Sequence, residues 1–144
     1  MKNFIFLLIS FAILTACMTD RRNVRRLNGD WKIATYKQTD KLGFTNVVAA
    51  TGNFHFHKYK LKEEKGTYTY DFSYFLSNDT VSFSESGEYY SAAKQEAIFL
   101  NSLDVDGKLI QTEKFHIDIL TTTDVIFQYN DLNVMHTFVL RKEK

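Results

Sequence analysis

The sequence predicts an all-β domain, an antiparallel up-and-down meander that closes as a barrel of about eight strands. From Gly29 onward, apolar and polar residues alternate with the period of two that is typical of half-buried strands. Turn-forming pairs interrupt this alternation every 8–12 residues or so, a spacing typical of antiparallel sandwiches and barrels. Because closure removes the open edges of a sheet, a barrel is the more economical arrangement. A two-sheet sandwich of the same strands is the alternative.

The chain begins with a segment typical of a secretory leader. Lys2 supplies a positive charge, and residues 4–14 are apolar apart from Ser10. A run of this length fits the apolar part of a signal peptide, about 7–15 residues, and falls short of the roughly 20 residues that span a bilayer as a helix. We therefore expect residues 1–16 to be a signal peptide that is removed.

The apolar run ends in the box Leu14-Thr15-Ala16-Cys17, which contains the only cysteine of the protein. The box resembles the signal-peptidase cleavage site of bacterial lipoproteins, in which the cysteine becomes the lipidated first residue. The resemblance implies lipidation of Cys17 with palmitate-like acyl chains, and a membrane partner reached through this anchor. It also implies a location in a bacterial cell envelope, with the outer membrane as the default. No thiol then remains for a disulfide, so the domain must be stabilised by core packing.

Residues 17–26 are interpreted as a lipidated tether, and residues 27–144 as the barrel domain. The tether has two interpretations that the sequence leaves open. In the first, it forms a basic collar against anionic lipid headgroups, each charge contributing about 1 kcal/mol near the surface. In the second, it is a solvated linker that becomes a helical turn near Val24–Leu27. The basic residues concerned are Arg21, Arg22, Arg25 and Arg26.

The charge balance of the mature chain excludes one class of partner. Removing residues 1–16 leaves 128 residues, the size of one domain, with 17 basic and 17 acidic side chains. Proteins that bind duplex nucleic acid normally carry a strongly basic face. We therefore expect no nucleic-acid partner.

The first strand begins at Gly29 and places Trp31 and Ile33 on one face and Tyr36 on the other. Residues 39–52 then break the alternation and contain the apolar patch 44–50, which is too short to be assigned as a helix. We expect this stretch to be an irregular connection.

Alternation resumes at Phe54 and Phe56, and its most regular run covers residues 67–75. Asp-Gly between alternating segments, as at residues 106–107, is a strong signal for a hairpin, and Ser86-Gly87 is another expected turn. Further strands are expected at residues 80–84, 87–92, 96–101, 109–111, 114–120, 124–130 and 134–141.

Gly29-Asp30-Trp31 resembles the Gly-x-Trp signature of lipocalins. It is more closely similar to small lipocalin-like lipoproteins of Bacteroidetes-type bacteria, in which a later Gly-x-Phe-x-Phe strand follows, here residues 52–56. Lipocalins also set a basic side chain of the last strand over the tryptophan ring, and Arg141 matches that position. The resemblance implies a lipocalin-like barrel in which Gly29, Trp31 and Arg141 have structural roles.

The resemblance also implies that the barrel binds a small apolar or amphipathic ligand. Aromatic walls with a few hydroxyl groups suit such a site. The alternative is a barrel with a filled core, whose tyrosine hydroxyls reach backbone carbonyls or water, and which docks on an envelope protein partner through patch 44–50. The residues expected to contact a ligand are Trp31, Phe56, Tyr68, Tyr70, Phe72 and Tyr74.

Other chemistry-bearing residues are interpreted as structural or solvated. His55 and His57 share a strand face, as a metal chelate requires, but Phe54 and Phe56 should claim the inner face. His116 and Asp118 pair in the same way without a nucleophile, and we expect His136 to be buried. We therefore expect no metal, no cofactor and no catalytic site, and hence no enzyme.

Overall fold

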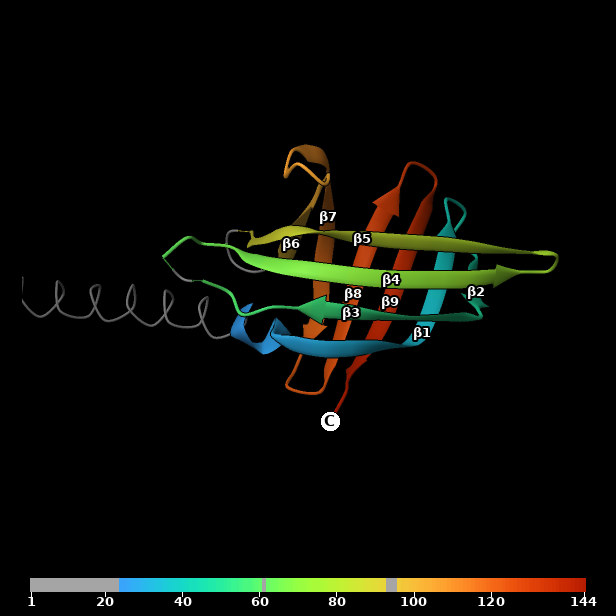
Figure 1. Ribbon diagram of the computed structural model, residues 1–144. Coiled ribbons are helices and arrows are strands. Elements are labelled where there is room, and N and C mark those ends of the chain that lie inside the picture. Colours follow the sequence, from blue (N-terminus) through green and yellow to red (C-terminus); the bar gives the residue numbers. More distant parts are fainter. Residues whose placement is uncertain (1–23, 61, 93–95) are drawn as a thin grey trace, which may run out of the picture.

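The computed structural model describes residues 24–60, 62–92 and 96–144, so the leader and Cys17 lie outside the described residues. A helical turn at residues 24–27 precedes nine antiparallel strands (Figure 1). The strands are β1 (Gly29–Asp40), β2 (Thr45–Val48), β3 (Ala50–Phe56), β4 (Gly66–Leu76), β5 (Asp79–Ser91), β6 (Ala97–Leu103), β7 (Leu109–Leu120), β8 (Asp124–Asp131) and β9 (Val134–Lys142).

The strands close into a barrel, which confirms the predicted fold class. They pair in the order β2-β1-β3-β4-β5-β6-β7-β8-β9, and β1 also pairs with β9 along most of its length. Eight strands therefore form a closed up-and-down ring, the arrangement also found in lipocalins. The ninth, β2, pairs with the second half of β1, while β3 pairs with its first half.

A bulge in β1 bends the barrel. The register between β1 and β9 shifts between Ile33 and Thr35, and the buried positions change from Trp31 and Ile33 to Tyr36. A bulge adds one unpaired residue and bends its strand, and in Figure 1 β1 turns here from the direction of β3–β5 to that of β7–β9. The prediction that Tyr36 faces away from the core is therefore wrong, because simple alternation does not anticipate a bulge.

The predicted irregular connection at residues 39–52 is also corrected. β1 continues to Asp40, and most of the apolar patch 44–50 forms β2 and the start of β3. The side chains of Phe44 and Val47 remain exposed at 67% and 71%. This segment became a strand because it pairs with the extended end of β1, a tertiary contact that short-range alternation does not reveal.

Gly87 lies inside β5 and not in a turn, so the predicted separation of residues 80–84 from 87–92 is wrong. A Cβ atom at Gly87 would lie 1.9 Å from the backbone oxygen of Asn101 on β6. The close approach of the two strands requires glycine here. Such close approach of another backbone is a common reason for glycine inside a sheet.

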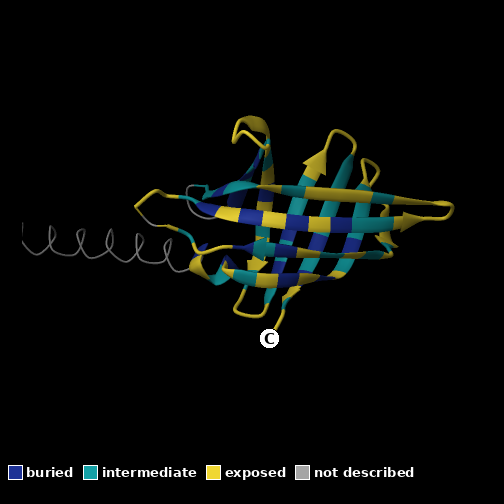
Figure 2. Cartoon of the chain, in the orientation of Figure 1, coloured by how far each residue is buried: buried dark blue, intermediate teal, exposed yellow. Residues whose placement is uncertain are grey.

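The helical turn closes one end of the barrel. Val24 and Leu27 are buried, and the indole nitrogen of Trp31 donates a hydrogen bond of 2.6 Å to the Leu27 carbonyl. The core runs from this closed end along the inner faces of the strands, and Figure 2 shows buried and exposed positions alternating along β4. Within the described residues, no helix has the length and apolar character needed to cross a membrane.

Lys142, and not Arg141, covers the tryptophan ring. The Lys142 ammonium lies 5.1 Å from the centre of the Trp31 ring and donates to the Asn28 carbonyl at 2.5 Å. Arg141 is directed outward and pairs with Asp124. The expected basic residue is thus displaced by one position, because successive side chains of a strand point to opposite faces.

Candidate functional site

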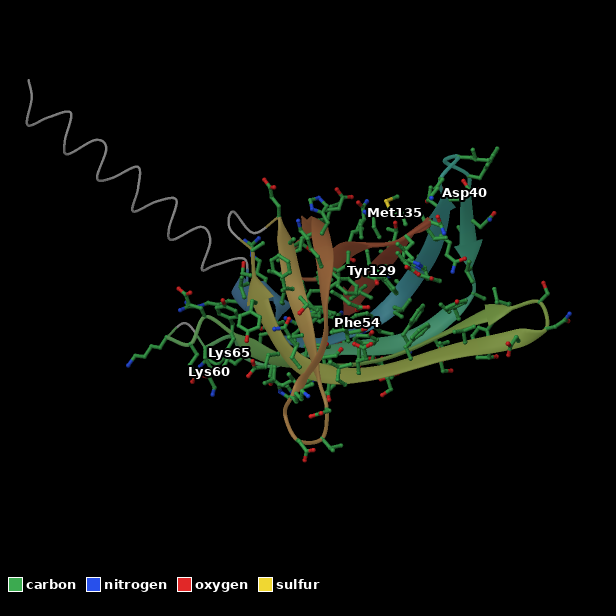
Figure 3. The ribbon with its side chains drawn as sticks, turned by 90° about the horizontal axis from the view of Figure 1, so that it is seen from above. Asp40, Phe54, Lys60, Lys65, Tyr129 and Met135 are labelled. Atoms are coloured by element: carbon green, nitrogen blue, oxygen red, sulfur yellow. The ribbon has the colours of Figure 1, made fainter. Side chains whose placement is uncertain are left out.

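A cavity of about 310 Å³ occupies the half of the barrel that is remote from the helical turn. We call it the open-end cavity, because it lies toward the end where the turns β1–β2, β4–β5, β6–β7 and β8–β9 lie. Figure 3 shows Phe54 and Tyr129 inside the barrel, with Lys60 and Lys65 at the closed end and Asp40 and Met135 at the opposite end. The lining residues are Tyr36, Phe54, Tyr70, Phe72, Tyr74, Phe83, Glu85, Gln111, Glu113, Phe115, Tyr129, Asp131, His136 and Phe138.

Aromatic rings form most of the cavity wall. Tyr36 packs edge-on against Phe72 with ring centres 4.9 Å apart, and Phe54 stacks on Tyr70 at 5.0 Å. Across the barrel, the ring centres of Tyr129 and Phe115 lie 5.2 Å apart. Such pairs contribute about 0.5–1.5 kcal/mol each beyond their buried area. The wall is therefore held in place before any ligand binds.

Carboxylate and amide groups interrupt this wall on β5 and β7. The Gln111 amide donates to Glu85 at 3.0 Å and contacts Glu113 at 3.4 Å, which brings the two carboxylates together around one amide. The Ser102 hydroxyl also donates to Glu85 and lies 3.3 Å from the Tyr68 hydroxyl. This polar cluster faces the inside of the barrel.

Enclosure in the barrel shifts the pKa values of Glu113 and of two neighbouring tyrosines. Burial, together with the Glu85 carboxylate, raises the pKa of Glu113 above its usual value, and Asp131 acts in the same direction. Burial, with a contribution from Glu113, raises the pKa of Tyr129 to about 12. Burial likewise raises the pKa of Tyr70. The tyrosines therefore stay neutral at physiological pH, and a charged Glu113 is destabilised by its surroundings.

His136, which the sequence predicts to be buried, is partly buried and lines this cavity. Its Nδ1 atom lies 2.6 Å from the Tyr36 hydroxyl, and the Gln38 amide donates to that same hydroxyl at 2.9 Å. Burial lowers the pKa of the imidazole. A neutral ring can accept a hydrogen bond from the Tyr36 hydroxyl at Nδ1, so His136 adds no positive charge to the cavity near neutral pH.

The six residues predicted to contact a ligand divide between the two ends of the barrel. Tyr70, Phe72 and Tyr74 line the open-end cavity. Trp31, Phe56 and Tyr68 fill the core instead and do not line it, since the helical turn plugs the barrel at their end. Ligand contact by these three residues stays a prediction.

Sequence analysis missed the polar part of the site. Glu85, Gln111, Glu113 and Asp131 all line the cavity, and none had been singled out. A signal was present, because Gln111 and Glu113 have the same phase as Phe115 in the alternation of β7. A carboxylate on the inner face of a strand is the pattern that would have identified them.

The other histidines lie outside the cavity. His55 is half-buried and contacts the Asp30 carboxylate, while His57, His116 and Asp118 are exposed. In the described part of the chain, no group of three or more histidine, cysteine or acidic residues is arranged to hold a metal ion.

The comparisons with known proteins concern the fold alone. The chain matches no protein-family model and no curated protein. Among solved structures it is similar to a redesigned β-barrel (TM-score 0.50, 14% identity, 85% of this chain and 96% of the other). A de novo designed fluorescence-activating β-barrel is similar to the same degree (TM-score 0.51, 8% identity, 84% and 98%). An S-type phycobiliprotein lyase from Guillardia theta has a TM-score of 0.41 at 9% identity over 83% and 89% of the two chains.

Proposed function

We propose that this protein is a lipid-anchored, lipocalin-like binding protein that holds a small amphipathic molecule in the open-end cavity and performs no catalysis. The observation that carries the proposal is the cavity itself, which lies beside the packed core and is lined mainly by aromatic rings. Its volume lies at the lower limit of the range of about 300–1,000 Å³ for small-molecule sites. One barrel of similar fold is a designed fluorescence-activating β-barrel, and a binding function is compatible with this fold.

The charge distribution supports an orientation with the closed end toward a membrane. A surface hollow at that end is lined by Arg25, Lys58, Lys60 and Lys62, with Glu63 as its one acidic residue. Basic side chains near an anionic leaflet are attracted to it. The lipid on Cys17 would join the chain at this same end, leaving the cavity directed away from the bilayer. The proposed location is the outer membrane of a bacterial cell envelope.

Cell fractionation tests the anchor. Full-length protein expressed in a bacterium should sediment with the membranes, and Cys17→Ser should move it to the soluble fraction, because the acylation site is lost. Met18→Ser serves as the matched control and should sediment. Membrane retention of Cys17→Ser would contradict the lipid anchor.

Native mass spectrometry of the full-length protein, released from detergent micelles, tests ligand binding. We expect a small molecule to copurify with the wild-type chain and to be absent from Gln111→Trp, which places an indole at the cavity rim. Thr112→Trp adds the same indole one residue away on the exposed outer face and should retain the molecule. An empty wild-type protein that also binds no hydrophobic dye would contradict the proposal.

A second candidate function, docking on an envelope protein, is favoured by apolar side chains at the tips of the open-end turns. Leu42 is 82% exposed and Leu132 is 94% exposed. Exposed apolar groups gathered at one end mark interaction surfaces more often than isolated ones do. Crosslinking in cells should yield a specific partner with the wild-type chain and lose it with Leu42→Ser/Leu132→Ser.

A further inference from the structure

The open-end cavity contains an excess of negative charge that its walls do not neutralise. Glu85, Glu113 and Asp131 line it, whereas no lysine or arginine does. Within the described ranges, none of these three carboxylates forms a salt bridge. His136 does not compensate, since its ring is held neutral by burial and its Nδ1 atom lies against the Tyr36 hydroxyl. The charged groups that a bound molecule meets in this cavity are therefore all negative.

The aromatic lining acts in the same direction as the carboxylates. The face of an aromatic ring carries partial negative charge and attracts cations within about 6 Å of its centre. Tyr70, Phe72, Tyr74 and Tyr129 surround the space next to Glu85 and Glu113. Ring faces beside carboxylates provide a partly desolvated site in which a cation is attracted by both the rings and the carboxylates.

Two other kinds of ligand fit these walls less well. An anionic lipid such as a fatty acid would place its carboxylate among three others with no counter-charge. Repulsion between these like charges disfavours such a ligand. A bare metal ion needs several ligands converging within bonding distance, and no such group of three exists among the described residues. The remaining class is a molecule with an apolar body and a positively charged head.

We propose that the ligand of this barrel is an organic ammonium ion whose charged head lies beside Glu85 and Glu113 on the cavity side of the Gln111 amide and whose apolar body packs on Tyr70, Phe72 and Tyr129. This inference rests on the proposed binding function and specifies its ligand class. The raised pKa of Glu113 agrees with it, because the Glu85 carboxylate opposes ionisation of Glu113 in the empty protein. A bound cation removes that opposition.

Calorimetric titration with three indole probes of matching body tests the inference. Full-length protein in lipid nanodiscs is titrated with tryptamine, tryptophol and indole-3-acetate, which are cationic, neutral and anionic, and empty nanodiscs supply the background. We expect tryptamine to bind about tenfold more tightly than tryptophol, a ratio within the range of cation–π and ionic attraction. Indole-3-acetate should bind most weakly.

Glu85→Gln/Glu113→Gln should reduce the affinity for tryptamine to that for tryptophol, with circular dichroism reporting the retained fold. Glu63→Gln/Glu64→Gln makes the same change in net charge at the closed end and should keep the wild-type preference. Equal binding of tryptamine and tryptophol by the wild-type protein would overturn the cation assignment while leaving the proposed binding function intact. Failure of all three probes and of a neutral hydrophobic dye would overturn both.

Discussion

Glu113 is a residue whose charge opposes folding and serves the proposed binding site. Its pKa in the folded chain lies above the ordinary value of 4.5, chiefly because the carboxylate is partly buried and lies near Glu85. The folded state therefore holds the proton more tightly than the unfolded state. The associated stability is present below about pH 4.5 and is lost as the pH rises through the higher folded value.

Glu113→Gln should accordingly stabilise the protein at pH 7, raising the midpoint of thermal unfolding by roughly 2–4 °C. The gain should disappear near pH 4, where the native carboxyl is protonated in both states. Differential scanning calorimetry at the two pH values provides the measurement, with Asp118→Asn, an exposed change on the same strand, as the control. A gain of equal size at both pH values would show that ionisation of Glu113 is not its cause.

Lys142 stabilises the closed end through the Trp31 ring and the carbonyls of Arg26 and Asn28. Lys142→Met should lower the free energy of unfolding by about 1–2 kcal/mol, because it removes a cation–π contact and charged hydrogen bonds. Arg141→Met, one residue away and exposed, should change it by less than about 0.5 kcal/mol. Urea unfolding of both variants distinguishes this arrangement from one in which Arg141 covers the ring.

At the scale of the strands, the β5–β6 contact depends on the absence of a side chain at Gly87. Gly87→Ala places a methyl group against the Asn101 carbonyl, so the two strands must separate. We expect a loss of more than about 2 kcal/mol in the free energy of unfolding. Ser86→Ala, exposed on the same strand, is the matched control and should be close to neutral. A stability of Gly87→Ala equal to that of the wild type would show that β5 and β6 can move apart at this point without cost.

Strand existence was largely predictable, because the alternation of residues 67–75 and the turn at Asp106-Gly107 are local signals that packing reinforced. The detailed course and pairing of the strands could not be predicted from such local signals. The bulge in β1 that brings Tyr36 inside and the pairing of patch 44–50 with β1 both depend on contacts between segments. The same limit applied to the site. The aromatic positions Tyr70, Phe72 and Tyr74 were recognisable from β4 alone, whereas the Glu85–Gln111–Glu113 cluster needs two strands to be brought together.

At the scale of the whole molecule, the barrel has two different ends. The closed end holds the helical turn, Trp31 and a basic surface hollow. The open end holds an aromatic cavity with three carboxylates. In the proposed arrangement, the first end faces the membrane and the second receives an amphipathic cation from the surroundings. Because the two ends differ in this way, the position of the bound ligand decides whether the proposed arrangement is correct.

The most direct test is nuclear magnetic resonance of the isotope-labelled, full-length protein in nanodiscs during titration with tryptamine. Trp31 is the only tryptophan, so its indole N–H gives one resonance that reports on the closed end. We predict that backbone amides of residues 70–74 and 111–115 shift with saturation, while the Trp31 indole resonance stays in place. Saturable movement of the indole signal with unchanged amides on β4 and β7 would contradict binding in the open-end cavity.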